Sequence, residues 1–160
     1  MGVILTKHFT MPQSLSKVYT HIIFSTKHRK NLIDDKIDHD LYNYIGGICK
    51  ELECNPIQVG GHKNHIHLLC LLSRKIALMT LVQEVKQSSS KWIKTINERY
   101  SNFYWQEGYG VFSVSPINVS KVIAYIQNQH RHHQKLNFKD EYLKFLKTYG
   151  IEFDERYIWD

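Results

Sequence analysis

The sequence predicts an α+β fold of the ferredoxin-like type, a βαββαβ sheet with helices on one face and further helices at the C-terminal end. The segments follow in the order strand, helix, strand, strand, helix, strand, which is the split βαβ arrangement. The first and third strands are central in that topology, and they are the two most apolar strand segments here. No internal repeat or low-complexity tract suggests another architecture.

The first half of the chain contains three of the predicted strands and one helix. Residues 17–25 (KVYTHIIFS) are β-branched and aromatic, which is typical of a central strand. Apolar residues recur at steps of three and four over 34–53, which predicts an amphipathic helix. Glycines 46 and 47 either weaken this helix or mark close packing. Residues 56–59 predict a short strand, and 65–72 (HIHLLCLL) predict a buried one.

The second half contains the fourth strand and three helices. Residues 76–100 predict a long helix whose apolar stripe is interrupted by serines 88–90, which we interpret as a solvated helix face. Residues 111–115 predict the last strand. Residues 119–135 predict a helix, and 139–149 predict a final one.

The length of 160 residues predicts one domain over 16–150, an N-terminal arm over 1–15 and a C-terminal tail over 151–160. The formal net charge is +6 and the pI is about 9.2, which suggests a polyanionic partner such as nucleic acid. The longest apolar stretch is far shorter than the ~20 residues of a membrane helix. With no leader-like start and three cysteines in no CxxC pair, we expect a cytoplasmic protein without a membrane partner.

Two histidines alternate with isoleucine in the predicted buried strand. His65 and His67 project to one side of the strand, with Cα atoms roughly 6.6 Å apart, while Ile66 points to the opposite side. Two imidazoles placed in this way can converge on one divalent ion. They can equally be unrelated polar residues at a strand edge. A metal site would in any case require a third ligand from elsewhere.

The predicted helix 119–135 provides candidates for further site residues. Tyr125 and Gln129 are four residues apart and therefore lie on the same stripe of the helix, with His132 one turn further along. Periodicity alone favours a plainer interpretation, in which Tyr125 is a boundary aromatic and Gln129 faces solvent.

Four segments together resemble a known family. NHIHLL (64–69) and YIQNQHRHH (125–133), together with THIIFSTKHR (20–29) and FYWQEGYGVFSVS (103–115), resemble the single-tyrosine HUH transposases of bacterial insertion sequences. HUH denotes two histidines separated by a hydrophobic residue. The triplet alone is weakly specific, but its order and spacing relative to YIxNQ are strongly so. The resemblance extends from about Met11 to the C-terminus.

The resemblance implies a transposase that nicks and rejoins single-stranded DNA next to hairpins, built on an RNA-recognition-like sheet. His65, His67 and Gln129 would be the ligands of a Mg²⁺ or Mn²⁺ ion. Tyr125 would be the nucleophile and would form a 5′-phosphotyrosine. The family also implies a homodimer with shared active sites, in which His65 and His67 of one subunit meet Tyr125 and Gln129 of the other.

Basic and aromatic residues are further candidates for holding DNA. The basic candidates, each of which can equally be an ordinary solvated charge, are Lys27, Arg29, Lys30, Lys86, Lys91 and Arg131. Trp105, Tyr109 and Phe112 can stack on bases, but we favour core positions for them. We interpret His21, in the first strand, as a structural residue near the histidine pair and not as a ligand.

Two other functions remain open. A domesticated nickase acting on host repeat hairpins would have the same catalytic residues, so the sequence cannot separate it from a transposase. A non-catalytic nucleic-acid-binding module would use its sheet as a stacking platform. The usual aromatic signature of such a platform is absent, which makes this alternative weaker.

Overall fold

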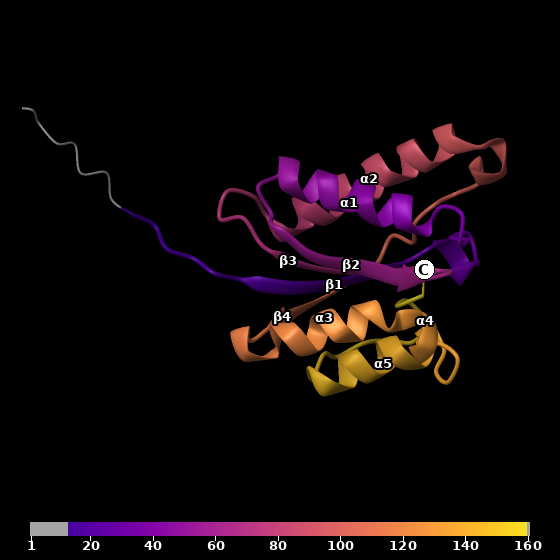
Figure 1. Cartoon of the computed structure of the whole chain (residues 1–160). Coiled ribbons are helices and arrows are strands. Elements are labelled where there is room, and N and C mark those ends of the chain that lie inside the picture. Colours follow the sequence, from indigo (N-terminus) through magenta and orange to yellow (C-terminus); the bar gives the residue numbers. More distant parts are fainter. Residues whose placement is uncertain (1–12, 160) are drawn as a thin grey trace, which may run out of the picture.

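The computed structural model describes residues 13–159, which form a four-stranded antiparallel sheet between two layers of helices (Figure 1). The strand order is β2-β3-β1-β4, so the two most apolar strands are central, as predicted. The strands are β1 (Tyr19–Ser25), β2 (Pro56–His62), β3 (His65–Leu71) and β4 (Gly110–Val114). The predicted ferredoxin-like α+β fold is confirmed.

One face of the sheet is covered by α1 (Asp38–Glu51) and α2 (Leu78–Ile96) (Figure 1). Alternate strand residues reach this layer, and Ile66 and Leu68 of β3 belong to its core, whereas His65 and His67 face the other way. The glycine pair of α1 does not mark close packing, because a Cβ added at either position would meet nothing within 4 Å.

The opposite face is covered by α3 (Val119–Gln127), α4 (Gln129–His132) and α5 (Phe138–Thr148). We predicted one continuous helix over 119–135, and this is wrong. The helix is interrupted at Asn128, whose backbone leaves helical geometry (ψ 15°) and whose side-chain amide donates to the Ala124 carbonyl at 2.8 Å. A side chain that caps the backbone in this way competes with helix continuation.

The serine triplet of α2 does not form a solvated face, contrary to our interpretation. Ser89 is fully buried, donates to the Val85 carbonyl at 2.5 Å and accepts from Trp105 Nε1 at 3.0 Å. This contact fastens the aromatic segment before β4 to the helix. Trp105 and Phe112 are core residues, as favoured, whereas Tyr109 is exposed.

The remaining differences are at element ends. β2 is longer than predicted, and α2 ends at Ile96, before a short 3₁₀ turn that the Asn97 side chain caps by accepting from Arg99 N. Most of the predicted arm lies outside the described residues. The described part of the predicted tail packs back on the domain, with the Trp159 ring beside Tyr142 and the Ile158 carbonyl accepting from Gln106 Nε2 at 3.0 Å.

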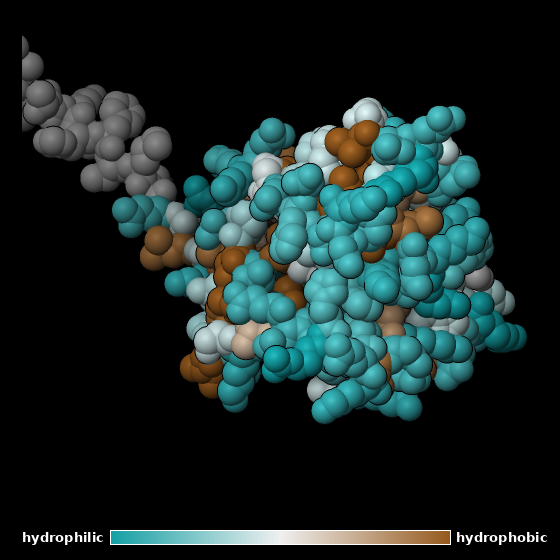
Figure 2. All heavy atoms as spheres, turned by 45° about the vertical axis from the view of Figure 1, so that its right-hand side comes forward, coloured by the Kyte–Doolittle hydropathy of each residue, from teal (hydrophilic) through white to brown (hydrophobic). Residues whose placement is uncertain are grey.

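The surface of the protein is mostly polar on the side that faces the viewer in Figure 2, with small separate hydrophobic areas. Within residues 13–159, no helix is both long and apolar enough to cross a membrane.

Candidate active site

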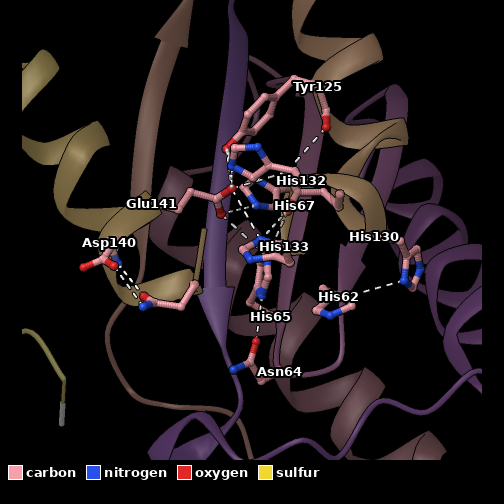
Figure 3. A network of polar contacts seen from close by, with 12 residues as sticks. His62, Asn64, His65, His67, Tyr125, His130, His132, His133, Asp140 and Glu141 are labelled. Carbon is pink, nitrogen blue, oxygen red and sulfur yellow. Dashed lines mark hydrogen bonds and ion pairs between the residues drawn. The ribbon is translucent and has the colours of Figure 1, made fainter. Parts of the chain in front are cut away.

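The site is built on the face of β3 that turns away from α1 and α2 (Figure 3). His65 and His67 are both 0% exposed, and their side chains point toward α3, α4 and α5. Strand alternation explains this placement, because Ile66 between them belongs to the opposite core. A rigid central strand therefore holds both imidazoles side by side, with ring centroids 5.1 Å apart.

Tyr125 and Gln129 approach the histidine pair from the layer of α3, α4 and α5. Gln129 Oε1 lies 3.0 Å from His65 Nε2, and the Tyr125 ring meets the His67 ring edge-on at 5.6 Å between centroids. The four-residue spacing survives the break at Asn128, since Gln129 Nε2 donates to the Tyr125 carbonyl at 3.4 Å. All four predicted residues thus meet within a single chain, and Gln129 is buried, not solvent-facing.

Glu141 of α5 is a site residue that the sequence analysis missed. Its side chain is nearly fully buried at the centre of the cluster (Figure 3). Oε1 lies 2.9 Å from His67 Nε2 and 3.6 Å from His65 Nε2, while Oε2 accepts from the Tyr125 hydroxyl. His132 Nε2 lies 3.1 Å from Oε2. The sequence does contain an indication that Glu141 is a site residue, because it falls within the apolar stripe of its helix. A carboxylate at such a position is buried and needs partners.

The outer nitrogens of the two imidazoles are held by other side chains. Asn64 Nδ2 donates to the Arg29 carbonyl, which leaves its Oδ1 facing His65 Nδ1 at 2.8 Å. Because Oδ1 can only accept, the proton of a neutral His65 lies on Nδ1, and Nε2 turns a lone pair toward the cluster. His67 Nδ1 lies 2.8 Å from Nε2 of His21, which matches the expected supporting position of His21. Such outer contacts fix the tautomer of metal-ligating histidines.

Burial dominates the electrostatics of the cluster. It lowers the pKa of His65 well below 6.5, assisted by the neighbouring His67, so the imidazole is neutral at pH 7. Burial, the Glu141 charge and the hydrogen bond to Glu141 raise the pKa of Tyr125 above 10. Burial alone would raise the pKa of Glu141, but hydrogen bonds from His133 and His67 outweigh it and hold this pKa far below 4.5.

The donor set fits a divalent cation. Ligand atoms of His65, His67 and Glu141 all lie within 4.8 Å of one another, and Gln129 Oε1 adds a neutral oxygen. Neighbouring ligand atoms around a six-coordinate ion with bonds of about 2.1 Å are roughly 3 Å apart, close to the spacings found here. Carboxylate and amide oxygens suit Mg²⁺ and Mn²⁺, and imidazoles suit later transition metals, so the donor set combines ligands of both kinds.

Of the residues predicted to contact DNA, Lys86 and Arg29 are partly buried and the other four are exposed. The Lys86 ammonium donates to the carbonyls of Gln106, Glu107 and Gly108 at 2.7–2.9 Å. Burial lowers the pKa of Lys86 to about 8, although the nearby Glu107 opposes this shift. Lys86 holds the segment before β4 in place. Arg29 is half-buried with its guanidinium 5.0 Å from the Trp159 ring. The exposed candidates are Lys27, Lys30, Lys91 and Arg131.

Lys91 lies in an open groove of about 710 Å³ between α2 and residues 104–109, on the side of the sheet opposite the histidine cluster. The exposed rings of Tyr104 and Tyr109 line it, and Lys94 Nζ lies 3.8 Å from the centroid of the Tyr104 ring. The groove therefore combines positive charge with aromatic surface.

Comparison with known proteins defines the class. The sequence profile of the family described as "Transposase IS200 like" matches residues 14–129, and the chain belongs to this family of transposases, which are DNA-cleaving enzymes. The resemblance seen in the sequence is thereby confirmed. No protein with a curated description matches the chain.

Two solved structures are similar in fold. One is a candidate transposase from Deinococcus radiodurans R1, at 20% identity and a TM-score of 0.58, covering 74% of this chain and 98% of that protein. The other is a REP-associated tyrosine transposase bound to a REP hairpin, at 11% identity and a TM-score of 0.57, covering 79% of this chain and 74% of that protein. The family match ends at residue 129, so α5 and Glu141 lie beyond it.

Proposed function

We propose that this transposase nicks and rejoins single-stranded DNA next to hairpins, with Tyr125 as nucleophile and a divalent cation held by His65, His67 and Gln129. One observation carries the proposal. The phenol, both imidazoles and the amide, which lie up to 64 residues apart in sequence, form a single polar cluster in which Tyr125 is half-buried and the other three side chains are buried. Convergence of several chemically competent side chains on one place is typical of an active site.

The chemistry follows from the properties of the phenol. The Tyr125 oxygen would attack a DNA phosphorus, the P–O3′ bond would break, and a 5′-phosphotyrosine and a free 3′-hydroxyl would result. The new ester keeps the energy of the phosphodiester, so a second 3′-hydroxyl can reseal it without ATP. A tyrosine with an unshifted pKa already costs about 4 kcal/mol to ionise at pH 7, and Tyr125 costs more. A bound divalent cation supplies the positive charge that lowers this cost and neutralises the attacked phosphate.

Hairpin DNA is the substrate that the observations favour. The chain carries a net charge of +6, and one of the similar structures is bound to a REP hairpin. Exposed Lys27, Lys30, Lys91 and Arg131 are the proposed phosphate contacts. A domesticated nickase of repeat hairpins remains the second candidate function, because the similar hairpin-bound structure is REP-associated. A stacking-platform module is disfavoured, since helices cover both faces of this sheet.

A homodimer with shared sites remains part of the proposal. The same contacts form within one chain here, and exchange of α3 together with α4 between two chains would reproduce them in trans. A mixing experiment separates the arrangements. Tyr125→Phe combined with a His65→Ala/His67→Ala variant regains cleavage when sites are shared, and stays inactive when every site is built within one chain.

The decisive test uses hairpin-bearing single-stranded oligonucleotides from the flanks of the protein's own gene. The wild-type chain with Mn²⁺ should form a protein–DNA species that resists denaturation. Tyr125→Phe should lose this species and keep hairpin binding, whereas Tyr157→Phe, which changes an exposed tyrosine of the C-terminal segment, should retain both. A covalent adduct that persists in Tyr125→Phe would remove Tyr125 from the role of nucleophile.

The buried free cysteines and the proposed DNA substrate are consistent with action in the cytoplasm.

A further inference from the structure

We propose that Glu141 is a further protein ligand of the cation and that its second oxygen holds the Tyr125 hydroxyl beside the ligand set. The inference rests on the proposed metal-dependent function. It concerns a residue of α5, outside the region that the family profile matches, so family membership does not imply it.

The charge of Glu141 calls for a positive partner. Its side chain is 1% exposed on the apolar face of α5, between Phe138 and Tyr142, which both belong to the core. Within residues 13–159, every ionic partner of Glu141 is a histidine. No lysine or arginine of the described chain neutralises it, although a buried carboxylate is costly unless it is paired or bound to a metal.

The geometry points Oε1 at the same place as the two predicted ligands. Oε1 lies 2.9 Å from His67 Nε2 and 3.6 Å from His65 Nε2, and His65 already carries its proton on the opposite nitrogen, against Asn64. A neutral His65 therefore directs a lone pair at Glu141 Oε1 and Gln129 Oε1, which are acceptors as well. No hydrogen lies between His65 Nε2 and either of these oxygens, so His65 Nε2 and the oxygens repel one another. A shared cation would attract all three atoms and would replace the hydrogen that His67 donates to Glu141.

The other carboxylate oxygen connects this ligand set to the nucleophile. Oε2 accepts the hydrogen of the Tyr125 hydroxyl, and Gln129 Nε2 lies 3.4 Å from the same oxygen. One carboxylate thus contacts the nucleophile with one oxygen and the ligand atoms with the other. Glu141 would position Tyr125 through this contact while binding the cation directly.

A purely structural role makes a different prediction. Glu141 could simply anchor α5 to the sheet, but Phe138, Tyr142 and Leu146 already bury that helix against Ile23. An anchoring residue would change the stability of the protein when replaced. It would not change the affinity of the folded protein for a cation.

The experiment is a titration of the full chain with Mn²⁺. Binding is measured by calorimetry and by the electron paramagnetic resonance signal of free Mn²⁺. Wild type should bind one ion, and His65→Ala should abolish binding. Glu141→Gln should weaken binding at least tenfold, while Glu152→Gln, an exposed carboxylate with no ion pair in the described chain, should bind as wild type. At saturating Mn²⁺, Glu141→Gln should also form the DNA adduct at least tenfold more slowly, with hairpin affinity unchanged.

The outcomes separate the two proposals. Wild-type Mn²⁺ affinity in folded Glu141→Gln, with binding lost in His65→Ala, overturns the role of Glu141 and leaves the proposed function standing. Absence of Mn²⁺ binding by the wild-type chain contradicts the metal part of the proposed function itself. Glu141→Asp keeps the charge but withdraws the carboxylate by one methylene, so it should bind Mn²⁺ more weakly as well. Unchanged affinity in this variant also overturns the inference, even where Glu141→Gln does not fold.

Discussion

A single methyl group added to β2 should displace the proposed nucleophile. A Cβ at Gly60 would lie 2.7 Å from Cγ2 of Ile126 and 3.0 Å from the carbonyl oxygen of the same residue. Ile126 directly follows Tyr125 in α3. Ordinary contacts begin at 3.4 Å, so accepting alanine requires the Ile126 carbonyl oxygen to withdraw by about 0.4 Å and the Ile126 Cγ2 methyl group by about 0.7 Å. The Gly60→Ala variant therefore tests how strictly the distance between helix and sheet sets the site.

The magnitude follows from that displacement. Overpacking of this kind typically costs 1–3 kcal/mol of folding free energy. Misplacement of a reacting group by about 1 Å can reduce a rate roughly a hundredfold, so we expect adduct formation to slow by about tenfold or more. A movement of β2 instead of α3 would have the same effect. Gly60 pairs with His67 in the sheet, so either movement changes the position of Tyr125 relative to His67.

The assay measures the rate of covalent adduct formation and, separately, the free energy of unfolding in urea. Gly47→Ala in α1 is the matched control, since a Cβ there meets nothing within 4 Å. This control should gain about 0.5–1 kcal/mol, because alanine favours a helix interior over glycine, and should keep the wild-type rate. Equal rates in Gly60→Ala and Gly47→Ala would refute the claim that this close approach positions Tyr125.

Three further predictions concern stability. Ser89→Ala should lower the free energy of unfolding by about 1–3 kcal/mol, because the buried Trp105 indole loses its acceptor; urea denaturation should show no comparable loss in Ser88→Ala. Acid should destabilise the fold, because burial lowers the pKa of His65 below 6.5 and hydrogen-bonded histidines hold that of Glu141 below 4.5 against the effect of burial. The unfolded chain then binds more protons, so stability is full above pH 6.5 and falls as the pH is lowered; equal urea midpoints at pH 8 and pH 5 would contradict this. Mn²⁺ at 100 times its Kd should raise the free energy of unfolding by about 2.7 kcal/mol, an increase measured by thermal or urea unfolding that His65→Ala should lack.

The strands could be predicted because their pattern is local. Alternation in β3 places Ile66 in the helix-covered core and both histidines on the other face, and the structure has this arrangement. The fold class followed from the order of such segments. The relation of Tyr125 to Gln129 was also local, since both lie within about one helical turn.

What the sequence could not provide depended on long-range contacts. Glu141 lies 74 residues from His67, and only the docking of α5 on the sheet joins them. Ser89 looks like a surface residue until the Trp105 side chain, 16 residues away, is placed on it. The break at Asn128 results from a side chain competing for a backbone carbonyl, which hydrophobic periodicity does not register.

Besides its contacts, Glu141 would adjust the charge of the proposed site. The pKa of Glu141 is held below 4.5 and the neighbouring His65 is neutral at pH 7, so Glu141 contributes one negative charge at the place where the cation would bind. This charge would cancel one of the two positive charges of a divalent cation, and one phosphodiester anion would balance the other. Without Glu141, both positive charges of the cation would remain uncompensated by its protein ligands, and the anionic 5′-phosphotyrosine product would be retained more strongly. The proposed reaction would gain from this balance, because in it the same tyrosyl phosphate would have to form and break in one place.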